Sequence, residues 1–212
     1  MVLDSKRDSV EFILDPLSKA LSRFHPNTLS WIAFILAIVA GLLIYFSYGD
    51  YWYILLPLAA IVVILSGFFD AIDGKVARMT FKSSKRGDLL DHVLDRYADV
   101  IMIGSVAVSA WCSPYIGILA IIGVLLTSYM GTQCQAIGAG RLYSGLLGRA
   151  DRVVLLTLAP IMQVIYMAIT DSAWITIGDY SITIFGIVML WFAIIGNLTA
   201  VQRAIKIWKM LG

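Results

Sequence analysis

Long apolar segments recur along this chain of 212 residues, and short polar turns separate them. A helix needs about 20 apolar residues to cross the roughly 30 Å hydrocarbon core of a bilayer. Six segments approach that length, at residues 28–47, 52–80, 88–111, 115–140, 149–170 and 182–204. The third is polar for its first two turns and apolar after Val100. The sequence therefore predicts an all-α integral membrane protein with six transmembrane helices.

The composition supports a membrane protein. Hydrophobic residues make up 60% of the chain, charged residues make up 14%, and the mean hydropathy is +0.86. Soluble domains are about 45–50% apolar and about 25% charged, so these values exclude a soluble single-core domain, a disordered chain and a nucleic-acid-binding protein. The two cysteines, Cys112 and Cys134, form no CxxC pair and are expected near opposite membrane faces, which predicts unpaired thiols that fill apolar space.

The placement of lysine and arginine predicts the orientation in the membrane. With an even number of spans, both termini lie on one side, together with the connections that follow the second and fourth spans. All 16 lysines and arginines fall on that side, whereas the opposite loops carry Asp50, Asp171 and Asp179 and no basic residue. Because positively charged loops stay in the cytoplasm, this basic side is predicted to be cytoplasmic, in a multi-pass protein of the cell membrane.

Residues 8–24 precede the first span and form a separate element. Their apolar side chains follow a helical period, at Val10, Ile13, Leu14, Leu17, Leu21 and Phe24. The pattern predicts an amphipathic helix that lies in the cytoplasmic interface, although a helix packed directly on the bundle would show the same stripe. No internal repeat, low-complexity tract or linker interrupts the chain, so residues 1–212 are predicted to form one domain.

Four aspartates flank the turn between the second and third spans. Asp70 and Asp73 are three residues apart, and Asp91 and Asp95 are four apart, so each pair lies on one helical face. The turn makes the two helices antiparallel neighbours. The four carboxylates are therefore predicted to converge at the cytoplasmic end of the bundle.

Carboxylates held this close repel one another unless protons or cations neutralise them. Oxygen ligands without a neighbouring cysteine or histidine cluster suit hard cations such as Mg²⁺ or Mn²⁺, and two such ions about 3.5–4 Å apart are a known device for displacement at phosphorus. We therefore expect Asp70, Asp73, Asp91 and Asp95 to hold two Mg²⁺ or Mn²⁺ ions; solvated interfacial aspartates are the alternative. Asp99, one turn further, is expected to orient a ligand residue or to pair two helices.

The same stretch carries further residues at characteristic spacings: Gly74, Ala77, Arg78 and Gly87. With the aspartates they read Asp-x2-Asp-Gly-x2-Ala-Arg-x8-Gly-x3-Asp-x3-Asp. This pattern resembles the signature of the CDP-alcohol phosphotransferases and matches all eight of its fixed positions. The six-span topology with a leading amphipathic helix is also similar to that family. The resemblance thus covers essentially the whole chain, although only residues 70–95 carry the specific motif.

The resemblance implies a reaction and a set of site residues. Members of this family move a phosphoryl-alcohol unit from a CDP-linked donor to a hydroxyl acceptor and release CMP. By position, Asp70, Asp73 and Asp91 correspond to aspartates that hold the metals. Asp95 corresponds to the last aspartate, which also lies at the metals and is implied to be the catalytic base for the acceptor hydroxyl. The resemblance further implies a homodimer, and it implies that the CDP moiety is bound by Asp73, Gly74, Ala77, Arg78 and Gly87.

Three arginines mark a candidate site for the acceptor. Arg149 and Arg152 open the fifth span, and Arg203 closes the sixth at the same level. Arginine forks suit phosphate oxygens, and this arrangement resembles the family branch that makes phosphatidylinositol phosphate or its archaeal ether-lipid counterpart. The predicted acceptor is inositol phosphate, with glycerol phosphate second; anchoring by positive-inside placement is the alternative for the arginines. That branch usually has a Lys-Ala-Arg stretch late in the fourth span, where this chain reads Tyr129–Gln133, so either Arg141 supplies that charge or the acceptor differs.

Two other classes of protein compete with a membrane enzyme. A divalent-cation transporter would also carry intramembrane acids, but it should place polar groups at mid-membrane, and spans one, two, five and six lack charges at their centres. A non-catalytic scaffold would not need four converging carboxylates. The sequence therefore favours a Mg²⁺-dependent phosphotransferase of lipid synthesis. Its predicted partners are a CDP-linked lipid donor, a polar phosphorylated acceptor and membrane lipids.

Overall fold

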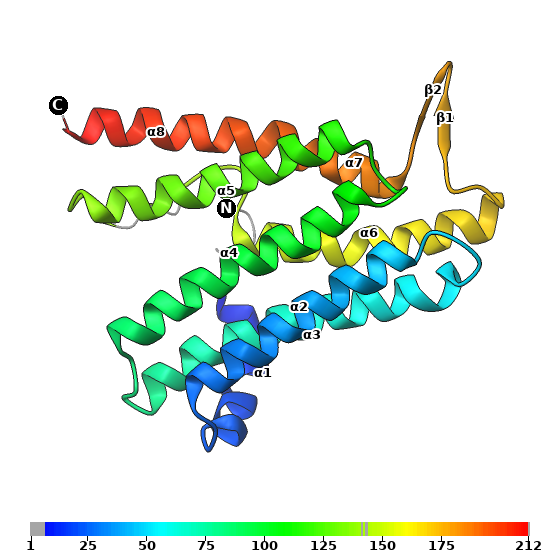
Figure 1. The fold of residues 1–212 in the computed structure, drawn as a ribbon. Coiled ribbons are helices and arrows are strands. Elements are labelled where there is room, and N and C mark those ends of the chain that lie inside the picture. The colour runs from blue at the N-terminus through cyan, green and yellow to red at the C-terminus, as the bar shows by residue number, and fades with distance from the viewer. Residues whose placement is uncertain (1–6, 141, 143, 212) are drawn as a thin grey trace.

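The computed structural model describes residues 7–140, 142 and 144–211, and for residues 7–13 it describes the backbone. Arg141, a candidate for the acceptor charge, lies outside the described residues. The elements follow in the order α1 (Arg7–Leu21), α2 (Pro26–Phe46), α3 (Trp52–Met79), α4 (Lys85–Val108), α5 (Pro114–Ala136), α6 (Arg149–Thr170), β1 (Ile175–Ile177), β2 (Tyr180–Ile182), α7 (Ile184–Trp191), a π-helical turn (Phe192–Gly196) and α8 (Asn197–Leu211). The long helices form a bundle, with α1 near one end and the β1–β2 hairpin projecting from the other (Figure 1).

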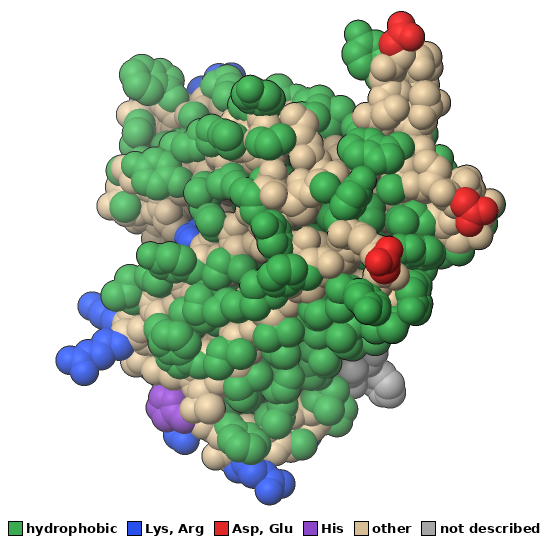
Figure 2. Space-filling view, turned by 45° about the vertical axis from the view of Figure 1, so that its right-hand side comes forward, with side chains coloured by type: hydrophobic (Ala, Val, Ile, Leu, Met, Phe, Trp, Pro, Cys, Tyr) green, Lys and Arg blue, Asp and Glu red, His purple; other side chains and the backbone are tan. Residues whose placement is uncertain are grey.

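Five described helical stretches are long and apolar enough to cross a membrane: α2, α3, α5, α6 and the continuous stretch Ile184–Leu211. The chain is thus a multi-pass membrane protein. Helix α4 packs against α2 and α5, but charged residues occupy its first turns, which lowers its hydropathy below that of the others. Apolar side chains cover the face between two polar ends of the molecule, one basic and one acidic (Figure 2). The basic end exposes Lys82, Lys85, Arg86, Lys206 and Lys209, and the acidic end exposes Asp50, Asp171 and Asp179.

The core of the bundle is built largely from small and branched apolar side chains. Helix α2 lies against α3 and α4 through Ala37, Ala40 and Ile44, which are fully buried. Helices in a bilayer associate through close packing, so small residues that let backbones approach are favoured at their contacts. Gly117 of α5 shows this closeness, because a Cβ atom there would lie 2.2 Å from the Cβ atom of Ala107.

The π-helical turn interrupts the last membrane helix and is tied to α5. The side chain of Asn197 donates a hydrogen bond of 3.0 Å to the carbonyl of Leu119 in α5. In return, Thr127 of α5 donates its hydroxyl hydrogen to the carbonyl of Gly196 at 2.8 Å. The bond from Thr127 satisfies a carbonyl in the wider turn, where the regular helical ladder is broken. The helix then continues well beyond the predicted end at residue 204.

The β1–β2 hairpin was not predicted from the sequence, and it departs from the all-α expectation. Thr176 pairs opposite Ser181 in this short antiparallel ladder. The fully buried Gln163 of α6 donates to the carbonyl of Ala173 at 3.0 Å and accepts from the backbone N–H of Ile184 at 2.9 Å. The Gln163 side chain therefore bonds the segment before the hairpin and the segment after it. Because of the hairpin, the last helix begins at Ile184 rather than at the predicted residue 182.

The N-terminal helix α1 packs on the bundle. Leu14 and Leu21 contact a buried cluster formed by α2 and α3, and Lys75 of α3 forms an ion pair with Asp15. The described part of α1 thus contacts its neighbours directly, while Leu17 and Phe24 of the apolar stripe stay exposed, so its predicted place in the membrane interface stays a prediction.

The two cysteines are buried free thiols, as predicted. Cys112 lies in the connection between α4 and α5, and burial raises the pKa of its thiol to about 11. The thiol therefore stays protonated at neutral pH and behaves as an apolar filler.

Candidate active site

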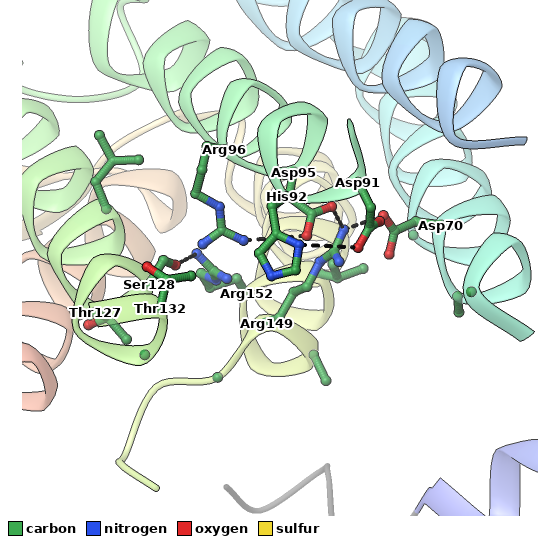
Figure 3. Close-up of a pocket in the computed structure, with 18 of the residues that line it drawn as sticks. Asp70, Asp91, His92, Asp95, Arg96, Thr127, Ser128, Thr132, Arg149 and Arg152 are labelled. Atoms are coloured by element: carbon green, nitrogen blue, oxygen red, sulfur yellow. Dashed lines mark hydrogen bonds and ion pairs between the residues drawn. The ribbon is translucent and has the colours of Figure 1, made fainter. Parts of the chain in front are cut away.

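A cavity of about 970 Å³ opens between α3, α4, α5, α6 and α8, where α4 and α6 begin (Figure 3). Its wall gathers most of the residues that the sequence singled out: Asp70, Asp73, Gly74, Arg78, Asp91, Asp95, Arg149, Arg152 and Arg203. Ala77 and Gly87 are not among its described lining residues. Apolar side chains of α4 and α5, including Val93, Tyr97 and Leu125, also line the cavity. The cavity thus offers charged and apolar surfaces to one ligand.

Three carboxylates meet in this cavity. One oxygen from each of Asp70, Asp91 and Asp95 lies within 4.8 Å of the other two. The local sequence explains the meeting: Asp70 lies near the end of α3, a short turn reverses the chain, and α4 presents Asp91 and Asp95 one turn apart. The side chain of Ser84 caps α4 by accepting the N–H of Gly87 at 3.0 Å. The predicted convergence of these three aspartates is therefore present.

Asp73 is placed differently from the other three. It is buried, and its Oδ2 atom accepts a hydrogen bond of 2.5 Å from the hydroxyl of Ser30 in α2. Its carboxylate is not part of the three-oxygen group formed by the described residues. Asp73 still lines the cavity, so its predicted contacts with a metal and with CDP stay predictions. Nothing in the sequence around Ser30 pointed to this partnership.

A guanidinium occupies the space between the carboxylates. The Nη2 atom of Arg149 contacts Asp70 Oδ1 and Asp95 Oδ1 together (Figure 3). Arg149 is the first residue of α6, which begins there because the N–H of Gly148 donates to Asp151 at 2.8 Å. The sequence had assigned Arg149 to the acceptor phosphate, whereas the structure places it on the acidic cluster. The carboxylates therefore fit a cation at this position, and their oxygen ligands suit Mg²⁺ or Mn²⁺.

A second ion pair lies one turn deeper. Arg152 Nη1 donates to Asp99 Oδ2 at 2.7 Å and to the hydroxyl of Ser128 at 3.4 Å. Arg96 lies between the two ion pairs, with Nη2 at 3.4 Å from Asp95 and at 3.9 Å from Asp99. Asp99 therefore connects α4 with α6 through this ion pair. Arg96 was overlooked, although a basic residue directly after Asp95 was a visible signal.

Arg203 is held by backbone carbonyls. Its Nε atom donates to the carbonyl of Ser144 at 2.8 Å, and Nη1 donates to the carbonyl of Thr127 at 2.5 Å. A Cβ atom at Gly131 would lie 3.3 Å from Arg203 Nη1, so a glycine there leaves room for the guanidinium. Arg203 is buried and lines the cavity.

The remaining signature residues surround the end of α3 and the start of α4. A Cβ atom at Gly74 would lie 3.4 Å from Arg78 Nη1, so the missing side chain leaves space beside the guanidinium. A Cβ atom at Gly87 would lie 3.4 Å from the Asn27 side chain at the start of α2. Gly87 thus permits a close approach of α2 and α4, and its predicted contact with CDP stays a prediction.

The sequence model of the CDP-alcohol phosphatidyltransferase family matches residues 23–208. The chain belongs to this family. The matched range runs from the end of α1 into α8 and contains every cavity residue described above. The family resemblance drawn from the signature is therefore confirmed. Membership of a transferase family favours an enzyme over the cation transporter.

The CDP-alcohol phosphatidyltransferase relatives are similar along most of their length. An archaetidylinositol phosphate synthase of Pyrococcus horikoshii is 29% identical over 180 residues, which cover 82% of this chain and 92% of the relative. The crystal structure of a Mycobacterium tuberculosis phosphatidylinositol phosphate synthase with CDP-DAG bound has a TM-score of 0.69 at 20% identity, covering 92% of this chain and 94% of that one. The same enzyme in complex with manganese and citrate has a TM-score of 0.71 at 19% identity, covering 92% and 88%. The chain therefore has the fold of these membrane enzymes.

Proposed function

We propose that this protein transfers the phosphoryl-alcohol unit of a CDP-linked lipid, phosphatidyl or archaetidyl, to a hydroxyl of inositol phosphate and releases CMP. The observation that carries this proposal is one cavity in which three aspartates of the family signature lie beside arginines of α6 and α8. The similarity to an archaetidylinositol phosphate synthase supports the choice of acceptor. Glycerol phosphate is the second candidate, because it offers the same phosphate to the arginines.

Asp70, Asp91 and Asp95, joined by Asp73, are the residues that would hold two Mg²⁺ or Mn²⁺ ions. When bound there, such ions would offset the diphosphate charge and the charge of the departing CMP. Three of the four carboxylates already lie together, and two of them contact the cationic Arg149, which supports a cation site there. Asp73 lies one turn from Asp70 on α3 and faces the same cavity.

Asp95 would act as the general base. The acceptor hydroxyl oxygen forms a bond to the donor phosphorus that carries the lipid alcohol, the bond from that phosphorus to CMP breaks, and the hydroxyl proton passes to Asp95. A carboxylate needs to lie within hydrogen-bond reach of that hydroxyl. The position of Asp95 supports this role, because it lies beside Asp70 and Asp91 and its carboxylate contacts both Arg96 and Arg149. No covalent intermediate on the protein is required.

The two substrates would occupy different parts of the cavity. Asp73, Gly74, Ala77, Arg78 and Gly87 form the proposed surface for CDP at the end of α3 and the start of α4. Arg152 and Arg203, with Arg149 once it leaves the carboxylates, form the proposed surface for the acceptor phosphate. The apolar residues of the cavity wall suit the lipid part of the donor.

The membrane arrangement is also part of the proposal. Helix α4 would serve as the third of six spans, because it packs within the bundle and is apolar in its second half. The basic end would face the cytoplasm by the positive-inside rule, so donor, acceptor and active site would meet at that face. We also propose one domain over residues 1–212 and a homodimer, as the family resemblance implies; light scattering of the purified protein tests the dimer.

One assay tests the reaction and the acceptor together. The purified protein is incubated with a CDP-lipid and Mg²⁺ or Mn²⁺, and CMP release is measured with inositol phosphate, glycerol phosphate, serine or free inositol. Inositol phosphate should give the highest kcat/KM, and a chelator should abolish turnover. Faster reaction with serine or free inositol would mean that the arginines are not an acceptor-phosphate site. Full turnover in metal-free buffer would contradict the metal proposal.

A further inference from the structure

Helices α4 and α6 face each other through two ion pairs at matching depths. Asp95 and Asp99 are one turn apart on α4, and Arg149 and Arg152 are one turn apart on α6. Asp95 pairs with Arg149, and Asp99 pairs with Arg152 at 2.7 Å. Only the first of these carboxylates belongs to the family signature. The second pair lies deeper and contains Arg152, one of the proposed acceptor residues.

Only some of the hydrogen-bond donors of Arg152 have partners among the described residues. The residue is 4% exposed and lines the cavity. Its Nη1 atom donates to Asp99 and Ser128, while Nε has no hydrogen-bond partner among the described residues. A guanidinium has five N–H donors in a rigid fork, so fixing one nitrogen fixes the direction of the others. An unpartnered buried donor costs free energy unless a ligand supplies an acceptor.

Arg96 approaches the same two carboxylates, Asp95 more closely than Asp99. It donates a hydrogen bond of 3.4 Å to Asp95 and lies 3.9 Å from Asp99, so Asp95 is its principal carboxylate partner. Neutralising Asp99 would leave the hydrogen bond from Arg96 to Asp95 in place. Arg152 would lose the acceptor that holds its guanidinium. The charge on Asp99 therefore acts mainly on the arginine of the acceptor site.

We infer that Asp99 is a positioning residue for the acceptor: it holds Arg152 so that the remaining N–H groups of the guanidinium face the acceptor phosphate. The inference rests on the proposed function, since it assumes a phosphorylated acceptor at Arg152. It differs from simple helix pairing. A buried ion pair that merely joins two helices contributes to folding, whereas a positioning residue changes the affinity for one substrate and not for the other.

The test compares Asp99→Asn, Asp99→Glu and Arg152→Gln with the control Asp50→Asn. Asp50 is an exposed aspartate in the turn between α2 and α3 and does not line the cavity, so its replacement makes the same chemical change outside the proposed machinery. CMP release is measured while inositol phosphate and CDP-lipid are varied in turn. Because a hydrogen bond to a charged group is lost, D99N should raise the acceptor KM about tenfold to a hundredfold. The donor KM and kcat should stay close to their original values.

Two further results are expected if Asp99 acts through Arg152. D99E keeps the charge but displaces it by one methylene group, so it should raise the acceptor KM less than D99N. The double variant D99N/R152Q should be no worse than R152Q alone, because both changes remove the same contact. D50N should match the unsubstituted protein. If D99N fails to fold, D99E and R152Q still provide the comparison.

The experiment distinguishes a failure of the Asp99 inference from a failure of the proposed function. If R152Q raises the acceptor KM and the Asp99 variants lower only the melting temperature, Asp99 merely pairs the helices and the inference is wrong, while the proposed function stands. If R152Q leaves the acceptor KM unchanged, or inositol phosphate releases no CMP, the proposed acceptor site is wrong and the inference falls with it. An equal rise in the donor and acceptor KM would also overturn the inference, because it would indicate general distortion of the cavity.

Discussion

Ser30 of α2 donates its hydroxyl hydrogen to Asp73 of α3 at 2.5 Å, and both residues are buried. The bond crosses between the first two membrane helices and holds the one signature aspartate that stays outside the three-carboxylate group. A buried carboxylate is stable only when donors or cations satisfy it. Ser30 therefore belongs to the support of the active site, although it lies outside the signature.

Replacing Ser30 with alanine should weaken both the fold and donor binding. The substitution leaves Asp73 without its hydroxyl donor, which should cost about 1–3 kcal/mol and should raise the KM for the CDP-lipid. Thermal unfolding and donor titration measure the two effects. Ser105→Ala is the matched control, because the Ser105 hydroxyl donates only within its own helix, to the carbonyl of Ile101. Equal melting temperatures and equal donor KM values for S30A and S105A would show that the bond to Asp73 contributes neither to stability nor to donor binding.

Arg149 competes with metal for Asp70 and Asp95, because its guanidinium contacts both carboxylates. Arg149→Gln should therefore raise the affinity of the substrate-free protein for Mn²⁺, by about tenfold or more if one charged hydrogen bond is relieved. Electron paramagnetic resonance of free Mn²⁺ measures this directly. Arg86→Gln, at an exposed position near the start of α4, controls for the lost charge. Unchanged or weaker Mn²⁺ binding in R149Q would mean that Arg149 does not occupy the metal position.

Asp95→Asn tests the proposed base. Loss of general-base catalysis typically lowers a rate about 10²–10⁴-fold, so kcat should fall in this range while donor affinity changes much less. Turnover near that of the unsubstituted protein would remove Asp95 from the mechanism. Loss of donor binding instead would indicate that Asp95 serves mainly as a metal ligand.

The sequence predicts the acidic part of the site well, because its spacing is local. Helical periodicity puts Asp91 and Asp95 on one face, and the short turn after α3 brings Asp70 beside them. The sequence does not predict the contacts between segments that lie far apart along the chain. Ser30 meets Asp73 across 43 residues, and Arg149 meets Asp95 across 54. Such pairs depend on how helices pack, which the spacing of residues within one segment does not encode.

For the fold, too, the sequence predicts local features but not those that depend on contacts between distant segments. Hydropathy and turn residues locate the long helices, since a membrane span has a required length. The π-helical turn and the β1–β2 hairpin were missed. The turn depends on side chains of α5, such as Thr127, that satisfy its backbone. The hairpin depends on Gln163 of α6, whose single side chain holds both of its ends. Neither dependence is visible within the segment concerned.

Gly123 offers a test of how closely α5 packs on the π-helical turn. A Cβ atom at Gly123 would lie 2.7 Å from the Asn197 side chain, 2.8 Å from the Asn197 backbone nitrogen and 3.0 Å from the Phe192 carbonyl. Backbone atoms cannot move aside as a flexible side chain does, so Gly123→Ala should force α5 away from the turn. It should also strain the bond from Asn197 to α5. Overpacking of this kind typically costs about 1–3 kcal/mol.

The matched control for Gly123→Ala is Gly104→Ala in α4, where the nearest atom to an added Cβ is the Ile121 Cδ1 atom at 4.0 Å. Because that distance is an ordinary contact and alanine favours a helix over glycine, G104A should unfold at the same temperature as the unsubstituted protein or at a higher one. G123A should unfold at a clearly lower temperature in the same detergent. Since Arg203 lies further along the helix that follows the turn, G123A should also raise the acceptor KM. Equal melting temperatures for both variants would show that the π-helical turn is not closely packed against α5.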